Sequence, residues 1–236
     1  MSVKTYSLKK DGQKQVSEHF RVREFRCKDG SDKILISEEL VLVLEKLREK
    51  LSCSININSG YRTKSHNKKV GGSTVSKHLK GMAADIICKK DGKTVPAKTV
   101  CLAAQDLGLD GIAYISSSAT HIDVRGYRWW ADETKNNKKV SDFYMYFGAD
   151  YPEPAATVKK GDKGTPVRWV QDRLIRAGFK ISLDGSFGSA TDKAVRKYQK
   201  DKNITEEIIL LTKGILIIIV LNLFYIFYLN KGVLTF

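Results

Sequence analysis

Residues 76–85, Ser-Lys-His-Leu-Lys-Gly-Met-Ala-Ala-Asp, decide how this chain of 236 residues is interpreted. The stretch contains His78 and, after six intervening residues, Asp85. The glycine and the two alanines between them are small, which lets the backbone pass close to a metal ion. A catalytic zinc ion takes three protein ligands from His, Asp or Glu and keeps a further position for water. The stretch therefore offers two ligands of such a site.

Residues 121–125, His-Ile-Asp-Val-Arg, offer the third ligand. Alternate side chains of a strand point to the same face, so His121, Asp123 and Arg125 would form a row of an imidazole, a carboxylate and a guanidinium. Taken singly, each of these residues would be interpreted as an ordinary polar side chain. Together with the pair in residues 76–85, His121 completes a predicted site for one Zn²⁺.

Further motifs accompany these two stretches, and their order is informative. They are Ser59-Gly60-Tyr61-Arg62, His66-Asn67 and Gly71-Gly72. In this order the motifs resemble the zinc D-Ala-D-Ala carboxypeptidase family, whose members include wall-remodelling peptidases, vancomycin-resistance dipeptidases and phage endolysins. The resemblance covers about residues 15–130 and implies the Hedgehog/D,D-peptidase fold, a small α+β domain. Residues 24–30 are similar to the branch of the family found in Gram-positive phages and prophages.

The resemblance implies a role for individual residues. The residues that match the zinc ligands are His78, Asp85 and His121. Arg62 matches the arginine that binds substrate near the scissile peptide bond, and a guanidinium suits a terminal carboxylate or a developing oxyanion. Ser76 and His66 are expected on the substrate side of the site.

One position departs from the family pattern. Several members carry an Asp or Glu three residues before the last histidine ligand, as the general base, but this chain has Ser118 there. Asp123 is the nearest remaining candidate for taking a proton from the attacking water and passing it to the leaving amine. Its competing role is to orient His121 through the second ring nitrogen. The sequence leaves both roles open, and without a base the domain would bind zinc and wall peptide with little activity.

Hydrophobic spacing predicts the elements that carry these motifs. Ser37 is a suitable N-cap, and Pro96 and Gly108 are suited to begin and to end a helix. The predicted elements are a helix over 37–51, a strand over 54–58, a loop over 66–82, a strand over 83–88, a helix over 96–108, and short strands over 114–116 and 120–124. We assign residues 1–149 to this catalytic domain.

A second module follows a Pro- and Ala-containing linker at 150–157. Residues 158–205 are similar to the small helical peptidoglycan-binding domain often fused to wall hydrolases. Apolar spacing within Val167–Leu174 and Ala194–Tyr198 predicts two amphipathic helices, separated by a turn at Asp184-Gly185. Such a module would hold the enzyme on its polymer and raise the local substrate concentration.

The composition changes abruptly at residues 206–236. The pattern of the peptidoglycan-binding domain would continue with another Asp-Gly turn and a helix, so the module is expected to be truncated. Residues 208–229 carry one charge, Lys213, and are long enough to span a bilayer. The same residues are also what AT-rich DNA encodes in a wrong reading frame. A frameshifted tail is the preferred interpretation, and a C-terminal membrane anchor is the alternative.

Charge and cysteine content indicate the kind of partner and the compartment in which the protein is made. The formal net charge is +15 at pH 7, which favours an anionic partner such as an anionic wall polymer. No nucleic-acid-binding motif is present, so nucleic acid is not expected. The four cysteines form no CxxC pair and are interpreted as reduced thiols. The polar, lysine-rich start lacks the apolar region of a signal peptide, which predicts synthesis in the cytoplasm and action at the wall, as for a phage or prophage lysin.

These features predict a zinc metallopeptidase that hydrolyses the stem peptides of bacterial peptidoglycan, as a carboxypeptidase or an endopeptidase. The alternative is a wall-binding protein with weak or no catalysis, favoured by Ser118 and by the second module.

Overall fold

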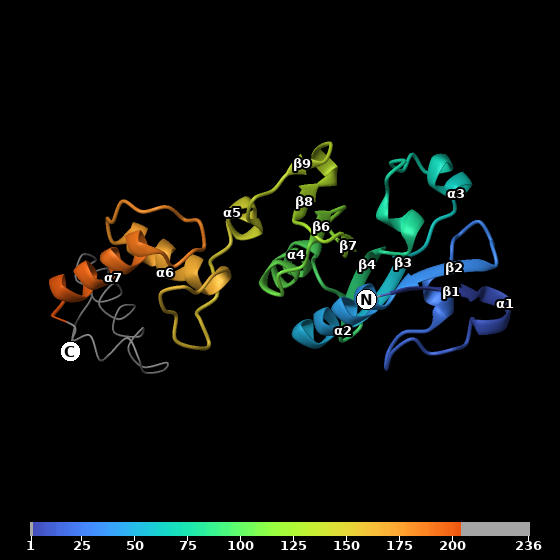
Figure 1. Cartoon of the computed structure of the whole chain (residues 1–236), viewed down its shortest axis with the longest axis horizontal. Helices are drawn as coiled ribbons and strands as arrows, with labels where there is room; N and C mark the ends of the chain where they lie inside the picture. The colour runs from blue at the N-terminus through green and yellow to red at the C-terminus, as the bar shows by residue number, and fades with distance from the viewer. Residues whose placement is uncertain (1, 204–236) are drawn as a thin grey trace. The chain divides into compact units, whose positions relative to one another are not determined.

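The computed structural model describes residues 2–203, which form two compact units (Figure 1). The first unit spans Met1–Ala149, and the second begins at Asp150. The first combines a sheet with helices and the second is helical. This confirms the predicted class, an α+β domain followed by an all-α module.

A sheet of seven strands within the described residues forms the centre of the first unit. The strand order is β3-β4-β7-β6-β8-β9, with β5 paired to β4. Neighbouring strands are antiparallel except β6 and β8, which run parallel. The strands are β3 (Ser54–Ser59), β4 (Ala83–Lys90), β5 (Lys93–Thr94), β6 (Gly111–Tyr114), β7 (Thr120–Asp123), β8 (Trp129–Asp132) and β9 (Lys138–Lys139).

The two faces of this sheet differ because side chains alternate along each strand. In β4, Ile86 and Cys88 are buried, and Ile122 of β7 joins them in one apolar cluster. Helices α2 (Glu38–Leu51) and α4 (Ala97–Asp106) supply the other side of this cluster. The intervening residues of β4 and β7 point to the opposite face, which is therefore free to carry polar chemistry.

Helix α2 matches its predicted bounds, and α4 begins at the predicted place but ends at Asp106, two residues before the predicted end. The Oγ of Ser37 accepts from the backbone N–H of Leu40 at 3.4 Å, which caps α2. Pro96 occupies the N-cap of α4, and Gly108 follows its end with a φ of +69°. The predicted strands over 54–58, 83–88 and 120–124 are confirmed as β3, β4 and β7.

Two local predictions are wrong. Residues 66–82 are not all loop, because α3 (Lys64–Lys69) and the 3₁₀ helix η2 (Lys77–Lys80) occupy part of this range. The cap of α3, Thr63, accepts from the backbone N–H of His66 at 3.1 Å and lies just ahead of the range considered. The first short strand is β6, which ends at Tyr114, because Ile115 and Ser116 both donate to the carbonyl of Ala119 in a tight turn.

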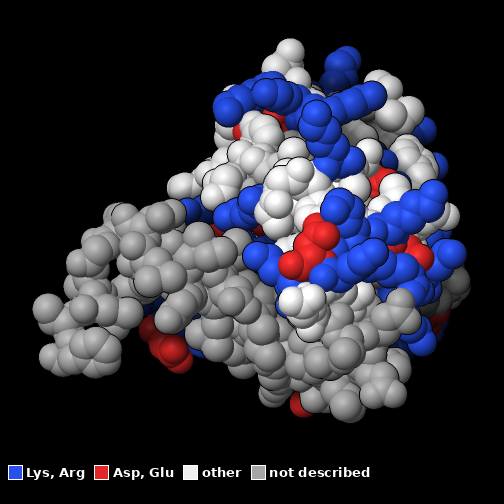
Figure 2. All heavy atoms as spheres, turned by 90° about the vertical axis from the view of Figure 1, so that its left-hand side faces the viewer, with Lys and Arg blue, Asp and Glu red and all other residues white. Residues whose placement is uncertain are grey.

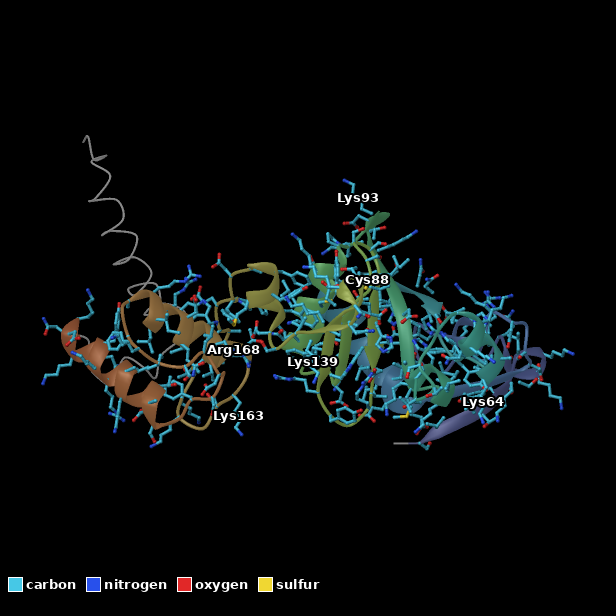
Figure 3. The ribbon with its side chains drawn as sticks, turned by 90° about the horizontal axis from the view of Figure 1, so that it is seen from above. Lys64, Cys88, Lys93, Lys139, Lys163 and Arg168 are labelled. Atoms are coloured by element: carbon cyan, nitrogen blue, oxygen red, sulfur yellow. The ribbon has the colours of Figure 1, made fainter. Side chains whose placement is uncertain are left out.

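Several elements of the first unit have no counterpart in the sequence analysis. They are the strands β5, β8 and β9 of the central sheet, a two-stranded antiparallel sheet of β1 (Val3–Ser7) and β2 (Lys33–Ser37), the helices α1 (Leu8–Asp11) and α5 (Phe143–Phe147), and the 3₁₀ helices η1 (Val22–Phe25) and η3 (Glu133–Lys135). All four cysteines are free and buried, as expected for reduced thiols. Cys88 is labelled on β4 in Figure 3, and burial raises the pKa of its thiol.

The second unit contains α6 (Thr165–Arg176) and α7 (Ser189–Asp201), the two predicted amphipathic helices. Leu174 of α6 packs against Ala194 and Tyr198 of α7. The turn between the helices is tied to α6 by Gln171, which accepts from the backbone N–H of Gly185 at 2.8 Å. Lys163, which precedes α6, and Arg168, which lies in α6, are labelled in Figure 3.

Residues 204–236 lie outside the described residues, and so does the interpretation of 206–236 as a frameshifted or membrane-anchoring tail. Among residues 2–203, no helix is long and apolar enough to cross a membrane.

Candidate metal centre

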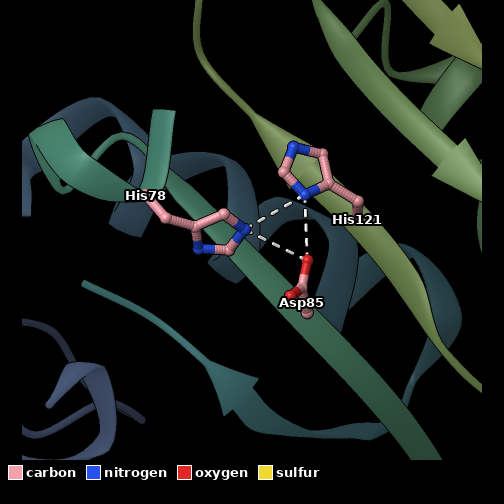
Figure 4. Close-up of side chains that lie close together, drawn as sticks. All are labelled: His78, Asp85 and His121. Carbon is pink, nitrogen blue, oxygen red and sulfur yellow. Dashed lines mark hydrogen bonds and ion pairs between the residues drawn. The ribbon is translucent and has the colours of Figure 1, made fainter. Parts of the chain in front are cut away.

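Three predicted ligands meet on the polar face of the sheet (Figure 4). The Nε2 of His78 lies 3.2 Å from Oδ1 of Asp85 and 3.3 Å from Nδ1 of His121. The third side of the triangle, from His121 Nδ1 to Asp85 Oδ1, is 2.9 Å. Within the described residues, the structure therefore brings together side chains that are 43 positions apart in sequence.

The fold brings each ligand to this point in a different way. Asp85 on β4 and His121 on β7 are direct partners across an antiparallel strand pair. His78 comes from η2, and Gly81 ends that helix with a φ of +67°. A side chain on Gly81 would overlap the backbone of Leu35, so this position requires glycine for its close approach as well as its dihedral angle. The turn sets His78 beside the start of β4.

Each imidazole has one nitrogen directed into the triangle and the other held by an acceptor. The Nδ1–H of His78 donates to the carbonyl oxygen of Gly60 at 2.7 Å. The Nε2–H of His121 donates to Oδ2 of Asp123 at 2.9 Å. These bonds fix the ring orientations, so that the inward nitrogens present their lone pairs to a metal ion once any proton on them has left, as metal-ligating histidines require.

The size and the chemistry of the triangle fit zinc. Ligand atoms at about 2.0–2.1 Å from a tetrahedral zinc ion lie about 3.3 Å from one another. The separations of 2.9, 3.2 and 3.3 Å are close to that value. Two imidazoles and one carboxylate are also a donor set found in catalytic zinc sites, where a position is left for water or substrate.

The acidic and basic groups of the cluster stabilise one another's charged forms. Burial would raise the pKa of Asp85, but the hydrogen bonds from His121 and His78 hold that pKa well below its usual range. Burial would lower the pKa of His121, but the bonds to Asp123 and Asp85 outweigh it and raise that pKa to about 9. A cation is therefore favoured at this position, whether it is a proton or a metal ion.

Asp123 lies beneath His121 and is fully buried. Besides His121, it accepts from the Nε of Arg125 at 2.7 Å and from the Nη2 of the same guanidinium. Burial would raise the pKa of Asp123, but Arg125 and His121 lower it. Gly111 on β6 makes room for this carboxylate, because a side chain there would overlap it. These contacts correspond to the orienting role considered for Asp123.

Arg62 reaches the cluster from the turn after β3. Its Nη2 donates to Oδ2 of Asp85 at 2.5 Å, and its Nε donates to Oγ of Ser59 at 2.9 Å. The side chain is 17% exposed, so part of the guanidinium is open to solvent beside the triangle. The arginine is therefore in direct contact with one member of the triangle and keeps part of its guanidinium accessible.

The other predicted substrate residues have no such contact. Neither the imidazole of His66 nor the hydroxyl of Ser76 makes a hydrogen bond to the cluster in the described part of the chain, although both are half-buried. Ser118 lies in the turn between β6 and β7, where its hydroxyl is 3.4 Å from that of Ser116.

The sequence analysis missed a group of cationic and aromatic side chains beside the cluster. The ring of Trp129 lies 6.0 Å from that of His121, centroid to centroid, in an edge-on arrangement. The guanidinium of Arg125 lies 4.2 Å from the centre of the Trp129 ring and 5.6 Å from that of Tyr127. The ammonium of Lys77 is also near Tyr127, at 5.9 Å from the ring centre. Three aromatic residues within 127–130, directly after the third ligand, were the available signal.

Comparisons with known proteins agree with this geometry. Residues 15–123 match the peptidase M15 family, the family of zinc D-Ala-D-Ala carboxypeptidases, and the match includes all three members of the triangle. Residues 163–207 match the family of peptidoglycan-binding domains. None of the curated proteins compared with the chain matches it. The chain thus combines a region that matches the peptidase M15 family of zinc peptidases with a following region that matches peptidoglycan-binding domains.

Proposed function

We propose that this protein hydrolyses the stem peptides of bacterial peptidoglycan with one Zn²⁺ held by His78, Asp85 and His121. The observation that supports the proposal most strongly is the triangle of ligand atoms, with sides of 2.9–3.3 Å, inside a peptidase M15 domain. The peptidoglycan-binding domain supports the polymer as the partner. When bound, a zinc ion supplies Lewis-acid polarisation of the scissile carbonyl and activation of water.

The chain's own residues divide the remaining work. Arg62 binds the substrate through the part of its guanidinium that does not contact Asp85, and it stabilises negative charge that develops on the carbonyl oxygen. Asp123 holds His121 in its ligating orientation. Ser76 and His66, which flank the site in sequence, contact the substrate farther from the scissile bond.

The bond that is cut lies in the stem peptide: the terminal D-Ala-D-Ala bond, a cross-link or the L-Ala-D-Glu bond. Lys and Arg side chains occupy much of the described surface in one view of the molecule (Figure 2). This charge suits anionic polymers that accompany peptidoglycan in Gram-positive walls. The combination of peptidase and wall-binding domains corresponds to a phage or prophage endolysin that acts at the wall.

The test is a digestion of purified Gram-positive peptidoglycan by the zinc-loaded full chain, with products identified by mass spectrometry. The His121→Ala variant removes one ligand, and His19→Ala is the matched control, because His19 contacts Glu45 and not the cluster. We expect the wild type and the control to release D-Ala or to split a stem peptide, and His121→Ala to release nothing. A wild type that binds zinc and leaves peptidoglycan unchanged would contradict the proposal.

A second function, wall binding without catalysis, is favoured by Ser118 in place of the usual acid. Its signature would be co-sedimentation of the chain with insoluble peptidoglycan without any released product.

A further inference from the structure

The residues of β8 alternate between the core and the metal centre. Trp130 faces the core, where its Nε1–H donates to the carbonyl of Leu109 at 3.0 Å, and Asp132 faces the same way and accepts from Tyr146 at 2.6 Å. Trp129 faces the opposite way, with its ring beside His121. The odd-numbered residues of this strand therefore point to the face that carries the ligands.

Glu133 is the next odd-numbered residue after this strand. The backbone is still extended at Asp132, with φ −111° and ψ 107°, so the alternation carries through to the start of η3 at Glu133. The register places His121, Ala113 and Ala131 in one row across β7, β6 and β8. Both alanines are buried and have short side chains, so no large side chain of β6 or β8 stands in this row between His121 and the end of β8. Glu133 is two residues past Ala131, so its side chain starts on the same face as this row. β8 lies two strands from β7, a distance of about 10 Å.

The electrostatic surroundings of Glu133 lead to the same placement. Its carboxylate interacts with the charges of His121, Asp85, His78 and Arg62, which are the members of the cluster. The side chain itself is exposed and makes no hydrogen bond among the described residues, so it is not committed to a structural contact. Although the residue as a whole is exposed, desolvation of the carboxylate by the surrounding protein raises the pKa of Glu133 above that of an ordinary glutamate.

The other two candidates for proton transfer either lack a carboxylate or have a carboxylate that is already hydrogen-bonded. Ser118 has no carboxylate. Asp123 is fully buried, and its oxygens accept from His121 and Arg125. His121 and Ala131 lie in the same row of the sheet. Past this row, at the same end of the sheet, β7 connects to the turn that contains Ser118, and β8 continues to Glu133. Glu133 therefore approaches the cluster from the side at which the usual acid of the family is missing.

We propose that Glu133 is a further catalytic residue of this centre, a carboxylate that transfers the proton between the attacking water and the leaving amine. The inference rests on the proposed peptidase function. In the first step, an O–H bond of the water breaks, its proton goes to the Glu133 carboxylate and its oxygen bonds to the scissile carbonyl carbon. In the second, the C–N bond breaks and the same proton goes to the nitrogen, which leaves as an amine.

The experiment compares Glu133→Gln with the wild type as full chains. Glu49→Gln is the matched control, because Glu49 is exposed on α2, away from the cluster. Zinc content is measured by atomic absorption, and binding of a synthetic stem pentapeptide ending in D-Ala-D-Ala is measured by calorimetry. Hydrolysis of the same peptide and of purified peptidoglycan is followed by mass spectrometry. We expect Glu133→Gln to keep zinc and to bind the peptide with unchanged affinity, while kcat falls about 10²–10⁴-fold. Glu133→Asp should recover part of the loss.

Each other outcome overturns a distinct statement. A Glu133→Gln variant with kcat within about threefold of an active wild type would refute the role of Glu133 and leave the peptidase function standing. Loss of zinc from Glu133→Gln would assign the residue to the structure of the site and not to catalysis. A wild type that hydrolyses neither substrate would refute the proposed function, and the role of Glu133 with it.

Discussion

Asp123 holds His121 from below: its Oδ2 accepts the Nε2–H of His121 at 2.9 Å, while Nδ1 of the same ring points to Asp85. We expect Asp123→Asn to weaken zinc binding about 10–100-fold, because an amide neither fixes the ring as firmly nor raises the basicity of its free nitrogen. The measurement is a competition titration with a chromogenic chelator. Asp91→Asn is the control, since Asp91 lies in a left-handed turn that asparagine tolerates.

The same titration separates the two roles considered for Asp123. Unchanged zinc affinity combined with a large loss of kcat would show that Asp123 does more than orient His121 and takes part in proton transfer.

Gly111 offers a second way to disturb this pair. A methyl group at Gly111 would overlap the carboxylate of Asp123, which Arg125 and His121 hold in place. We expect Gly111→Ala to displace Asp123 and to reduce zinc affinity about as much as Asp123→Asn does. Gly188→Ala is the control, because nothing lies within 4 Å of its added methyl group. Zinc binding by Gly111→Ala equal to that of the wild type would show that the carboxylate moves without loss of function.

Zinc binding should release protons. The pKa of His121 is raised to about 9, so at pH 7 the ring is protonated and a metal ion must displace that proton from Nδ1. Apparent zinc affinity is therefore expected to increase from pH 6 to pH 8 by up to about tenfold per pH unit. Calorimetry at pH 7 in buffers of different ionisation enthalpy counts the protons, and a count near zero would contradict this prediction. Asp123→Asn removes one cause of the raised pKa, so it should release fewer protons.

The second unit depends on Gln171. Its amide donates to Asp184 Oδ1 at 2.8 Å and to Thr191 Oγ1 at 3.1 Å, and its oxygen accepts from Gly185. Gln171→Leu would keep the volume but leave these groups without partners, at a cost of about 1–3 kcal/mol for each buried group left unpaired. We expect a lower urea midpoint for this unit and weaker co-sedimentation with peptidoglycan.

Zinc content should be unaffected in Gln171→Leu, because the metal centre lies in the other unit. Lys193→Leu is the control, since it introduces the same residue at an exposed position of α7. Full co-sedimentation of Gln171→Leu would show that wall binding does not require this turn.

The sequence alone predicted the parts of the structure that local chemistry determines. Ser37 and the spacing of leucines were sufficient for α2, whereas the ligands in 76–85 and 121–125 were predicted from their residue types together with the resemblance of the ordered motifs to a known family. β6 was misplaced because Gly111 and Ala113 have low strand propensity. Their small size serves the site, where it leaves room for Asp123 and for the approach to His121.

Glu133 could not be found in this way. Its relation to the cluster comes from the pairing of β8 with β6 and of β6 with β7, and nothing in the residues around position 133 specifies that register. Long-range pairing of this kind is decided by the packing of the whole sheet.

The pairing of Asp85 with His121 across β4 and β7 also bears on how the chain reaches its native state. A slip of one residue between these strands would turn one of the two side chains to the opposite face of the sheet and separate the ligands. A metal ion that binds both therefore stabilises only the native alignment, by an amount that grows with metal concentration. During refolding, zinc would favour the correctly aligned strands over the slipped ones. The yield of correctly folded protein should therefore depend on when the metal is added as well as on how much is present.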